Sequence, residues 1–155
     1  MTLEIRTDDL SGEATRALIA AHLDAMHAQT PPESVHALGI ERLRHPDITV
    51  WSAWHGDDLA GVGALQRREG EHGEVKSMRV APAHLRRGVA RALLRHIEAQ
   101  AAAMGLVRLQ LETGSGPDFA AARALYLSEG FTSCGPFAAY TDDPLSAYFS
   151  KELAR

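Results

Sequence analysis

Residues 74–91 read Glu-Val-Lys-Ser-Met-Arg-Val-Ala-Pro-Ala-His-Leu-Arg-Arg-Gly-Val-Ala-Arg, and this stretch decides the fold. It predicts a strand, a short basic loop and then a helix that runs to Ala103. The helix is amphipathic, because Val89, Leu93 and Ile97 recur at the spacing of a single helix face.

The loop before this helix has the features of an anion site. The first backbone N–H groups of a helix have no partner within the helix, and the helix dipole places partial positive charge there. Gly88 lies in this turn, and Arg86, Arg87 and Arg91 add guanidinium groups, which suit phosphate oxygens. The stretch therefore predicts that a pyrophosphate binds at the start of the helix.

The composition of the chain excludes several classes of protein. The 155 residues have an ordinary hydrophobic fraction of 45% and a net charge of −4, which argues against nucleic acid as the main partner. The single cysteine, Cys134, excludes an intrachain disulfide or a cysteine metal cluster. The eight histidines lack metal-ligand spacing, so no metal is expected. No signal peptide or membrane span is recognisable, so we expect a cytoplasmic protein without a membrane partner.

The rest of the chain divides into short strands and helices at its turn residues. Ser11 is expected to cap a helix that ends near Met26, and Asp118 a helix over about 119–129. A short helix is expected at Ile40–Leu43. Strands are expected at 3–6, 48–54, 59–65, 74–80, 106–112, 131–133 and 147–153. This order predicts one α/β domain over residues 1–155, with a mixed, mostly antiparallel sheet.

Two motifs resemble those of the GNAT N-acetyltransferases. Residues 85–90, Leu-Arg-Arg-Gly-Val-Ala, resemble the family's acyl-CoA motif Gln/Arg-x-x-Gly-x-Gly/Ala, and residues 125–131, Leu-Tyr-Leu-Ser-Glu-Gly-Phe, resemble its Leu-Tyr-x-x-x-Gly-Phe segment. Together, in this order, they form a specific signature. The tracts Pro-Pro-Glu-Ser-Val-His-Ala-Leu and Glu-Thr-Gly-Ser further resemble a bacterial, YsnE-like subgroup.

This resemblance implies the GNAT acyl-CoA N-acyltransferase fold, a twisted sheet flanked by about four helices, with acetyl-CoA as co-substrate. Two parallel strands, those of Met78 and Leu109, would separate into a wedge that holds the pantetheine arm. A Cβ at Gly88 would obstruct the close approach of the backbone to the pyrophosphate. The residues that the resemblance assigns to the cofactor are Met78, Arg79, Val80, Arg86, Arg87, Gly88, Val89, Ala90 and Arg91.

The resemblance also implies direct transfer of an acetyl group to a primary amine of a small molecule or peptide. Tyr126 matches the position of the family's general acid, which would protonate the departing thiolate. Glu74 matches a position where some members carry their general base, and Glu112 is a second candidate. Pairing into a homodimer through the C-terminal strands is common in the family.

The sequence departs from the family pattern at two positions. Leu85 stands where the acyl-CoA motif usually has glutamine or arginine, so backbone amides, Arg86 and Arg87 are left to bind the anion. Phe119 stands where many members have asparagine, seven residues before the tyrosine, so a hydrogen bond to pantetheine is lost or rerouted.

Other interpretations stay open. The chain could be a non-catalytic module that binds acyl-CoA and regulates a partner, or a hydrolase acting through Ser115. His22, His27 and His36 could line the acceptor pocket. The segment 137–143 could close it, with Asp142 and Asp143 attracting a cationic amine.

Overall fold

The computed structural model describes residues 2–35, 38–138 and 140–153. Its α-helices are α1 (Glu13–Gln29), α2 (Ile40–Leu43), α3 (Val89–Ala103) and α4 (Ala120–Ser128). Its 3-10 helices are η1 (Pro32–Ser34), η2 (Pro82–His84) and η3 (Pro117–Phe119). Its strands are β1 (Leu3–Asp8), β2 (Ile48–His55), β3 (Asp58–Arg68), β4 (His72–Val80), β5 (Arg108–Gly114), β6 (Thr132–Cys134) and β7 (Ser146–Glu152).

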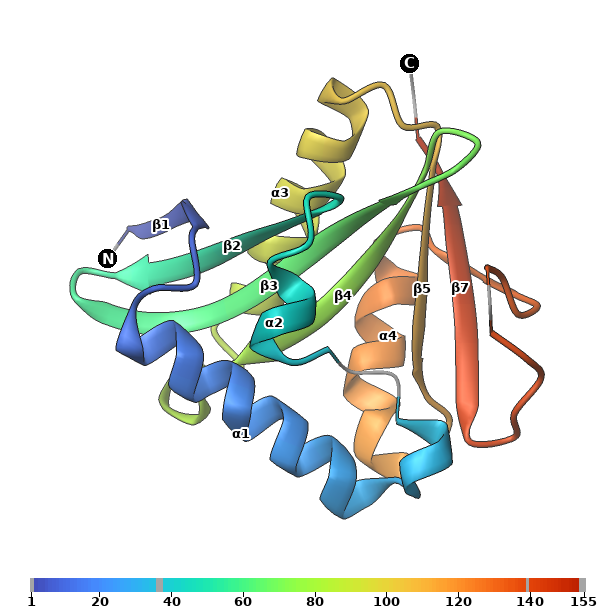
Figure 1. Cartoon of the computed structure of the whole chain (residues 1–155), viewed down its shortest axis with the longest axis horizontal. Coiled ribbons are helices and arrows are strands. Elements are labelled where there is room, and N and C mark those ends of the chain that lie inside the picture. Colours follow the sequence, from blue (N-terminus) through green and yellow to red (C-terminus); the bar gives the residue numbers. More distant parts are fainter. Residues whose placement is uncertain (1, 36–37, 139, 154–155) are drawn as a thin grey trace.

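The strands form one seven-stranded sheet in the order β1-β2-β3-β4-β5-β7-β6 (Figure 1). β4 and β5 run parallel, and the other described neighbours pair antiparallel. The connection from β4 to β5 is α3, as a parallel pair requires a crossover. The predicted mixed, mostly antiparallel sheet with four flanking α-helices is therefore confirmed for the described residues.

Helices cover both faces of the sheet, and each face has its own apolar core. Leu93 and Ile97 of α3 pack with Trp51 on one face, where Tyr126 of α4 joins the same cluster. On the other face, α1 and α2 pack against Val50. Trp51 and Val50 are neighbours on β2, so the two cores follow from the alternation of side chains along a strand.

Two expected helix caps are wrong. The Ser11 hydroxyl donates to Asp9 at 2.6 Å, and α1 begins at Glu13 after Gly12. Asp118 does not cap α4, because Pro117 starts the 3-10 turn η3 and places Phe119 at the start of α4. In the first case, Asp9 takes the hydrogen bond of the expected cap residue. In the second, the proline begins a 3-10 turn that includes the expected cap residue.

Ile97 is fully buried between α3 and the sheet, so truncation to alanine removes contacts that water cannot replace. We expect Ile97→Ala to lower the free energy of unfolding by about 2–5 kcal/mol. Urea denaturation would measure the change. Leu127→Ala is the control, because the Leu127 side chain is 55% exposed and its loss should cost less than about 0.5 kcal/mol. Equal losses in the two variants would contradict this account of the core.

Candidate active site

The parallel strands β4 and β5 separate after a short paired segment. Their described pairing joins His72 to Arg108 and extends to Glu74 and Gln110. Beyond that point the two strands diverge, as Figure 1 shows. The expected wedge between the strands of Met78 and Leu109 is thus present in the fold.

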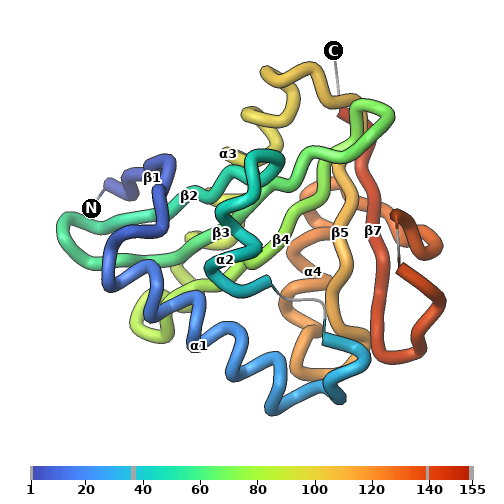
Figure 2. Tube along the Cα trace, in the orientation of Figure 1, coloured from blue at the N-terminus to red at the C-terminus, as the bar shows by residue number. Residues whose placement is uncertain are grey.

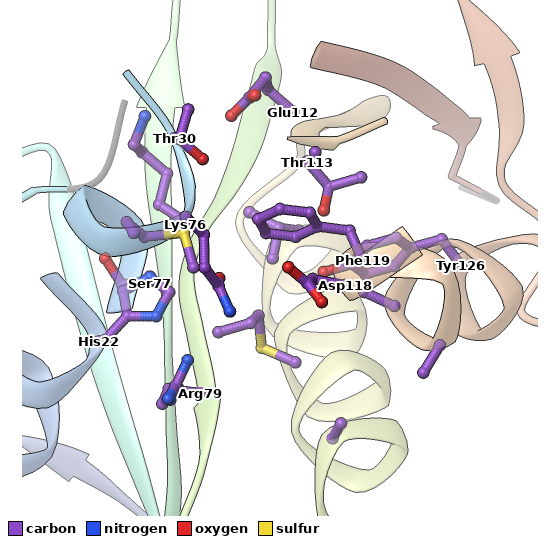
Figure 3. A pocket seen from close by; sticks show the side chains of 18 of the residues that line it. His22, Thr30, Lys76, Ser77, Arg79, Glu112, Thr113, Asp118, Phe119 and Tyr126 are labelled. Carbon is purple, nitrogen blue, oxygen red and sulfur yellow. The ribbon is translucent and has the colours of Figure 1, made fainter. Parts of the chain in front are cut away.

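A cavity of about 510 Å³ lies where the strands diverge. Its walls come from α1, η1, β4, β5, α4 and the segment before β7. In the trace of Figure 2, α1 and the chain that follows it run along the open end of the divergence. Figure 3 shows His22, Lys76, Ser77 and Arg79 on one side of the cavity, and Thr113, Phe119 and Tyr126 on the other.

A bulge in β4 shapes the first of these walls. Val62 pairs with Arg79 and Ala64 with Lys76, so two β4 residues lie opposite Gly63 alone. One of the two, Ser77, has a positive φ of 55°. After the bulge, Met78 packs against the core that contains α3. Arg79 lies close enough to His22 of α1 for its positive charge to lower the pKa of His22.

The cofactor residues predicted on β4 all line the cavity. Met78, Arg79 and Val80 lie beyond the last described pair between β4 and β5. Their backbone therefore forms a strand edge that an extended ligand can join by hydrogen bonds.

The basic turn lies at the end of the same cavity, where Leu85 and Ala90 contribute to the lining. Gly88 is the N-cap of α3 and has a φ of +79°, and Arg86 also has a positive φ of 62°. A Cβ at Gly88 would meet no protein atom within 4 Å. Within the protein itself, the left-handed backbone rather than a close contact favours this glycine.

The Arg91 side chain makes contacts within the protein. Its guanidinium donates to Ser128 at 3.0 Å and to Glu129 at 2.5 Å, and Arg95 also contacts Glu129. These contacts join α3 to α4. At the turn, Arg86 and Arg87 are the exposed cations, and Arg91 can contribute its backbone N–H.

Gly88→Val should weaken binding of acetyl-CoA, the co-substrate that the resemblance implies, at least tenfold, because a β-branched residue disfavours the left-handed turn at the helix start. Isothermal titration calorimetry would measure the dissociation constant. Gly105→Val is the matched control: Gly105 follows α3 at its other end, with a φ of +83° and open space around a Cβ. A similar loss of affinity in both variants would mean that the turn has no specific role.

Tyr126 lies on α4 with its ring packed against Phe131 and Phe149, at centroid distances of 6.0 and 6.2 Å. The residue lines the cavity. Burial, together with the negative charge of Glu112, raises the pKa of Tyr126 to about 12. The phenol therefore keeps its proton near neutral pH and can donate it.

Glu74 is 1% exposed and lines the cavity at the start of the divergence. Arg68 contacts its Oε1 at 2.6 Å, and Lys76 contacts its Oε2 at 3.1 Å. The Tyr140 hydroxyl donates to Oε2 at 2.5 Å and accepts from Lys76 at 2.9 Å. Burial and the charge of Glu74 raise the pKa of Tyr140, so this phenol also stays protonated.

Lys76 and Arg68 were not predicted as site residues, and Tyr140 was considered only as part of the segment 137–143. Lys76 could have been found, because it lies two residues after Glu74 and therefore on the same face of the strand. Arg68 contacts Glu74 through the pairing of β3 with β4, and Tyr140 comes from a segment 66 residues away.

Glu112, the second candidate base, lies on β5 and also lines the cavity. Its Oε2 accepts a hydrogen bond from Ser146 at 2.8 Å. Glu74 and Glu112 thus approach the cavity from the two diverging strands.

The two departures from the family pattern both lie at the cavity. Leu85 is 57% exposed at the turn. The Phe119 ring lies against Gly114, where an added Cβ would come within 2.1 Å of Cδ2. An apolar ring thus occupies the wall next to Tyr126 in place of an amide side chain (Figure 3).

The other residues considered for the acceptor pocket have separate outcomes. His22 lines the cavity, while His36 lies outside the described residues. Tyr140, from the segment 137–143, also lines it, and Asp143 accepts a hydrogen bond from Ser34 at 2.5 Å, which holds this segment to η1. The Ser115 hydroxyl donates to the Pro144 carbonyl at 2.6 Å, directly after this segment.

Among the described residues, no group of three histidine, cysteine or carboxylate side chains is placed to hold a metal ion. None of the described helices combines the length and the apolar character that crossing a membrane requires.

Comparison with known proteins identifies related sequences and structures. The sequence model of the acetyltransferase (GNAT) family matches residues 14–131. The uncharacterised N-acetyltransferase YsnE of Bacillus subtilis is 52% identical over 151 residues, which cover 97% of this chain and 100% of YsnE. The uncharacterised N-acetyltransferase YedL of Escherichia coli is 52% identical over 149 residues, which cover 96% of this chain and 94% of YedL. The PaiA N-acetyltransferase of Thermoplasma acidophilum, solved in complex with coenzyme A, has the same fold with a TM-score of 0.73 at 15% identity, covering 98% of this chain and 99% of PaiA.

Proposed function

The chain belongs to the acetyltransferase (GNAT) family, and we propose that it transfers the acetyl group of acetyl-CoA to a primary amine of a small molecule or peptide. The observation that carries this proposal is the placement of Tyr126 and Glu74. A phenol that keeps its proton and a fixed carboxylate line one cavity, where two parallel strands diverge.

The described residues fit an extended, phosphate-bearing co-substrate. The open edge of β4 at Met78, Arg79 and Val80 would hydrogen-bond the pantetheine arm as an added strand does. The turn at Gly88 and the first N–H groups of α3 would bind the pyrophosphate, next to the exposed Arg86 and Arg87. The N–H groups concerned in α3 are those of Val89, Ala90 and Arg91.

The two proposed catalytic residues move protons at opposite stages of the reaction. Glu74 accepts one proton from the acceptor's ammonium group, which frees the nitrogen lone pair. The nitrogen then bonds to the thioester carbonyl carbon as the carbon–sulfur bond breaks, and Tyr126 donates its proton to the sulfur. The nitrogen loses its second proton as the amide forms, and this proton restores Tyr126, while Glu74 releases its proton to solvent.

Arg68, Lys76 and Tyr140 act on this reaction by positioning Glu74. Both carboxylate oxygens are hydrogen-bonded, so the side chain has one orientation at the cavity wall. Such fixed geometry lowers the reorganisation needed during proton transfer.

A screen of amines with acetyl-CoA, with free thiol as the readout, tests the proposal. We expect amine-dependent release of CoA together with an N-acetylated product detected by mass spectrometry. Binding of acetyl-CoA with no release in the presence of any amine would instead support the regulatory module. Release that does not depend on an amine would support a hydrolase.

A further inference from the structure

Three neighbouring polar groups in the cavity have no partner in the described part of the protein. The Nδ1 atom of His22 and the Oγ atom of Ser77 are buried without a hydrogen bond. The guanidinium of Arg79 is half-buried and makes neither an ion pair nor a side-chain hydrogen bond with a described residue. All three line the cavity, on the α1 side in Figure 3.

Such groups are costly to leave unmatched. A buried polar group without a partner loses its hydration and gains nothing in return. Each buried polar group without a partner therefore needs an explanation, and a bound ion is one of those that occur in proteins. A guanidinium, a hydroxyl and an imidazole together offer several donors to one small anion.

The charge on this side of the cavity also favours an anion. Arg68 and Lys76 share the carboxylate of Glu74. Arg79 is a third cation on this side, whereas the other two carboxylates among the described lining residues, Glu112 and the exposed Asp118, lie on the opposite wall. A monovalent anion at Arg79 would pair with the cation on this side that Glu74 does not contact.

His22 does not add a further charge. Burial and the positive charge of Arg79 lower the pKa of His22 to about 4, so the imidazole is neutral near pH 7. The site at Arg79 thus has one positive charge and two neutral polar groups. A site with one positive charge matches a carboxylate better than a phosphate dianion. The basic turn at Gly88 is the better site for a phosphate.

We propose that the acceptor is an amine that also carries a carboxylate group, and that Arg79 binds this carboxylate together with Ser77 and His22. The inference rests on the proposed acetyl transfer for the role of the amine, but the carboxylate site can be tested by binding alone. Arg79 has two functions in this account: its backbone lies along the cofactor edge, and its side chain selects the acceptor.

The experiment uses a panel of α- and ω-amino acids, each paired with the corresponding carboxamide. Calorimetry measures their binding to the protein saturated with CoA, which prevents turnover. We expect at least one amino acid to bind about 10- to 100-fold more tightly than its carboxamide, as a charged hydrogen-bonded pair provides. Arg79→Gln should remove this preference, and Arg79→Lys should keep part of it.

Arg67→Gln is the matched control, because it removes one positive charge from an exposed position of β3 that does not line the cavity. It should keep the full preference. Carboxylate binding should also raise the pKa of His22 from about 4, as NMR titration of its ring would detect, because the anion offsets the charge of Arg79.

Two results would overturn the inference: no amino acid preferred over its carboxamide, or a preference that survives in Arg79→Gln. Failure of the proposed function gives a different result. In that case, Arg79-dependent carboxylate binding would be present, but acetyl-CoA and the bound amino acid would give no free thiol.

Discussion

Replacing Tyr126 with phenylalanine is expected to lower kcat by about 100- to 10,000-fold, the usual contribution of a positioned proton donor. The phenol holds its proton because burial and Glu112 raise its pKa to about 12. Without the Tyr126 hydroxyl, the CoA thiolate must leave unprotonated or take a proton from water. The phenyl ring keeps the packing against Phe131 and Phe149, so binding of acetyl-CoA should not change.

Steady-state kinetics and calorimetry together test this expectation. Tyr148→Phe is the matched control, because the Tyr148 hydroxyl donates to the Thr141 carbonyl and the residue does not line the cavity. This variant also loses one tyrosine hydroxyl, and its kcat should stay within a few-fold of the wild-type value. An unchanged kcat in Tyr126→Phe would exclude Tyr126 as the general acid.

Glu74→Gln should have an effect of similar size on kcat, about 100- to 10,000-fold, because an amide cannot accept the proton of the amine. The change also leaves Arg68 and Lys76 beside a neutral group in a buried place. Breaking one side of a buried ion pair costs about 3–5 kcal/mol, so the free energy of unfolding should fall as well.

Comparison with Glu112→Gln separates the two candidate bases. Glu112 also lines the cavity, but its described hydrogen bond comes from a serine hydroxyl. The measurement is kcat, on protein shown to be folded by urea denaturation. We expect the large loss of kcat in Glu74→Gln and a change within a few-fold in Glu112→Gln. The reverse result would assign the base to Glu112.

The sequence was sufficient for those parts of the site that depend on local backbone. Alternation of apolar residues predicted the strands, and the 3.6-residue period predicted α3. The turn residue Gly88 lies at the start of α3, and its positive φ gives a further reason for glycine besides the predicted approach of a pyrophosphate.

Parts of the site that depend on packing between distant segments were not predictable. The contact of Arg68 with Glu74 requires the register of β3 against β4. The pairing of Arg91 with Glu129 requires α3 to lie against α4. Tyr140 reaches Glu74 from a segment whose position is set by the hydrogen bond between Ser34 and Asp143. No local pattern encodes these distances.

We propose that acetyl-CoA and the amine meet in this cavity and react in one direct transfer. Measuring free CoA and N-acetylated amine in the same reaction over time tests this proposal. The two products should appear in equal amounts and only when the amine is present. Release of CoA without an equal amount of acetylated amine, or binding of acetyl-CoA without release of CoA, would contradict it.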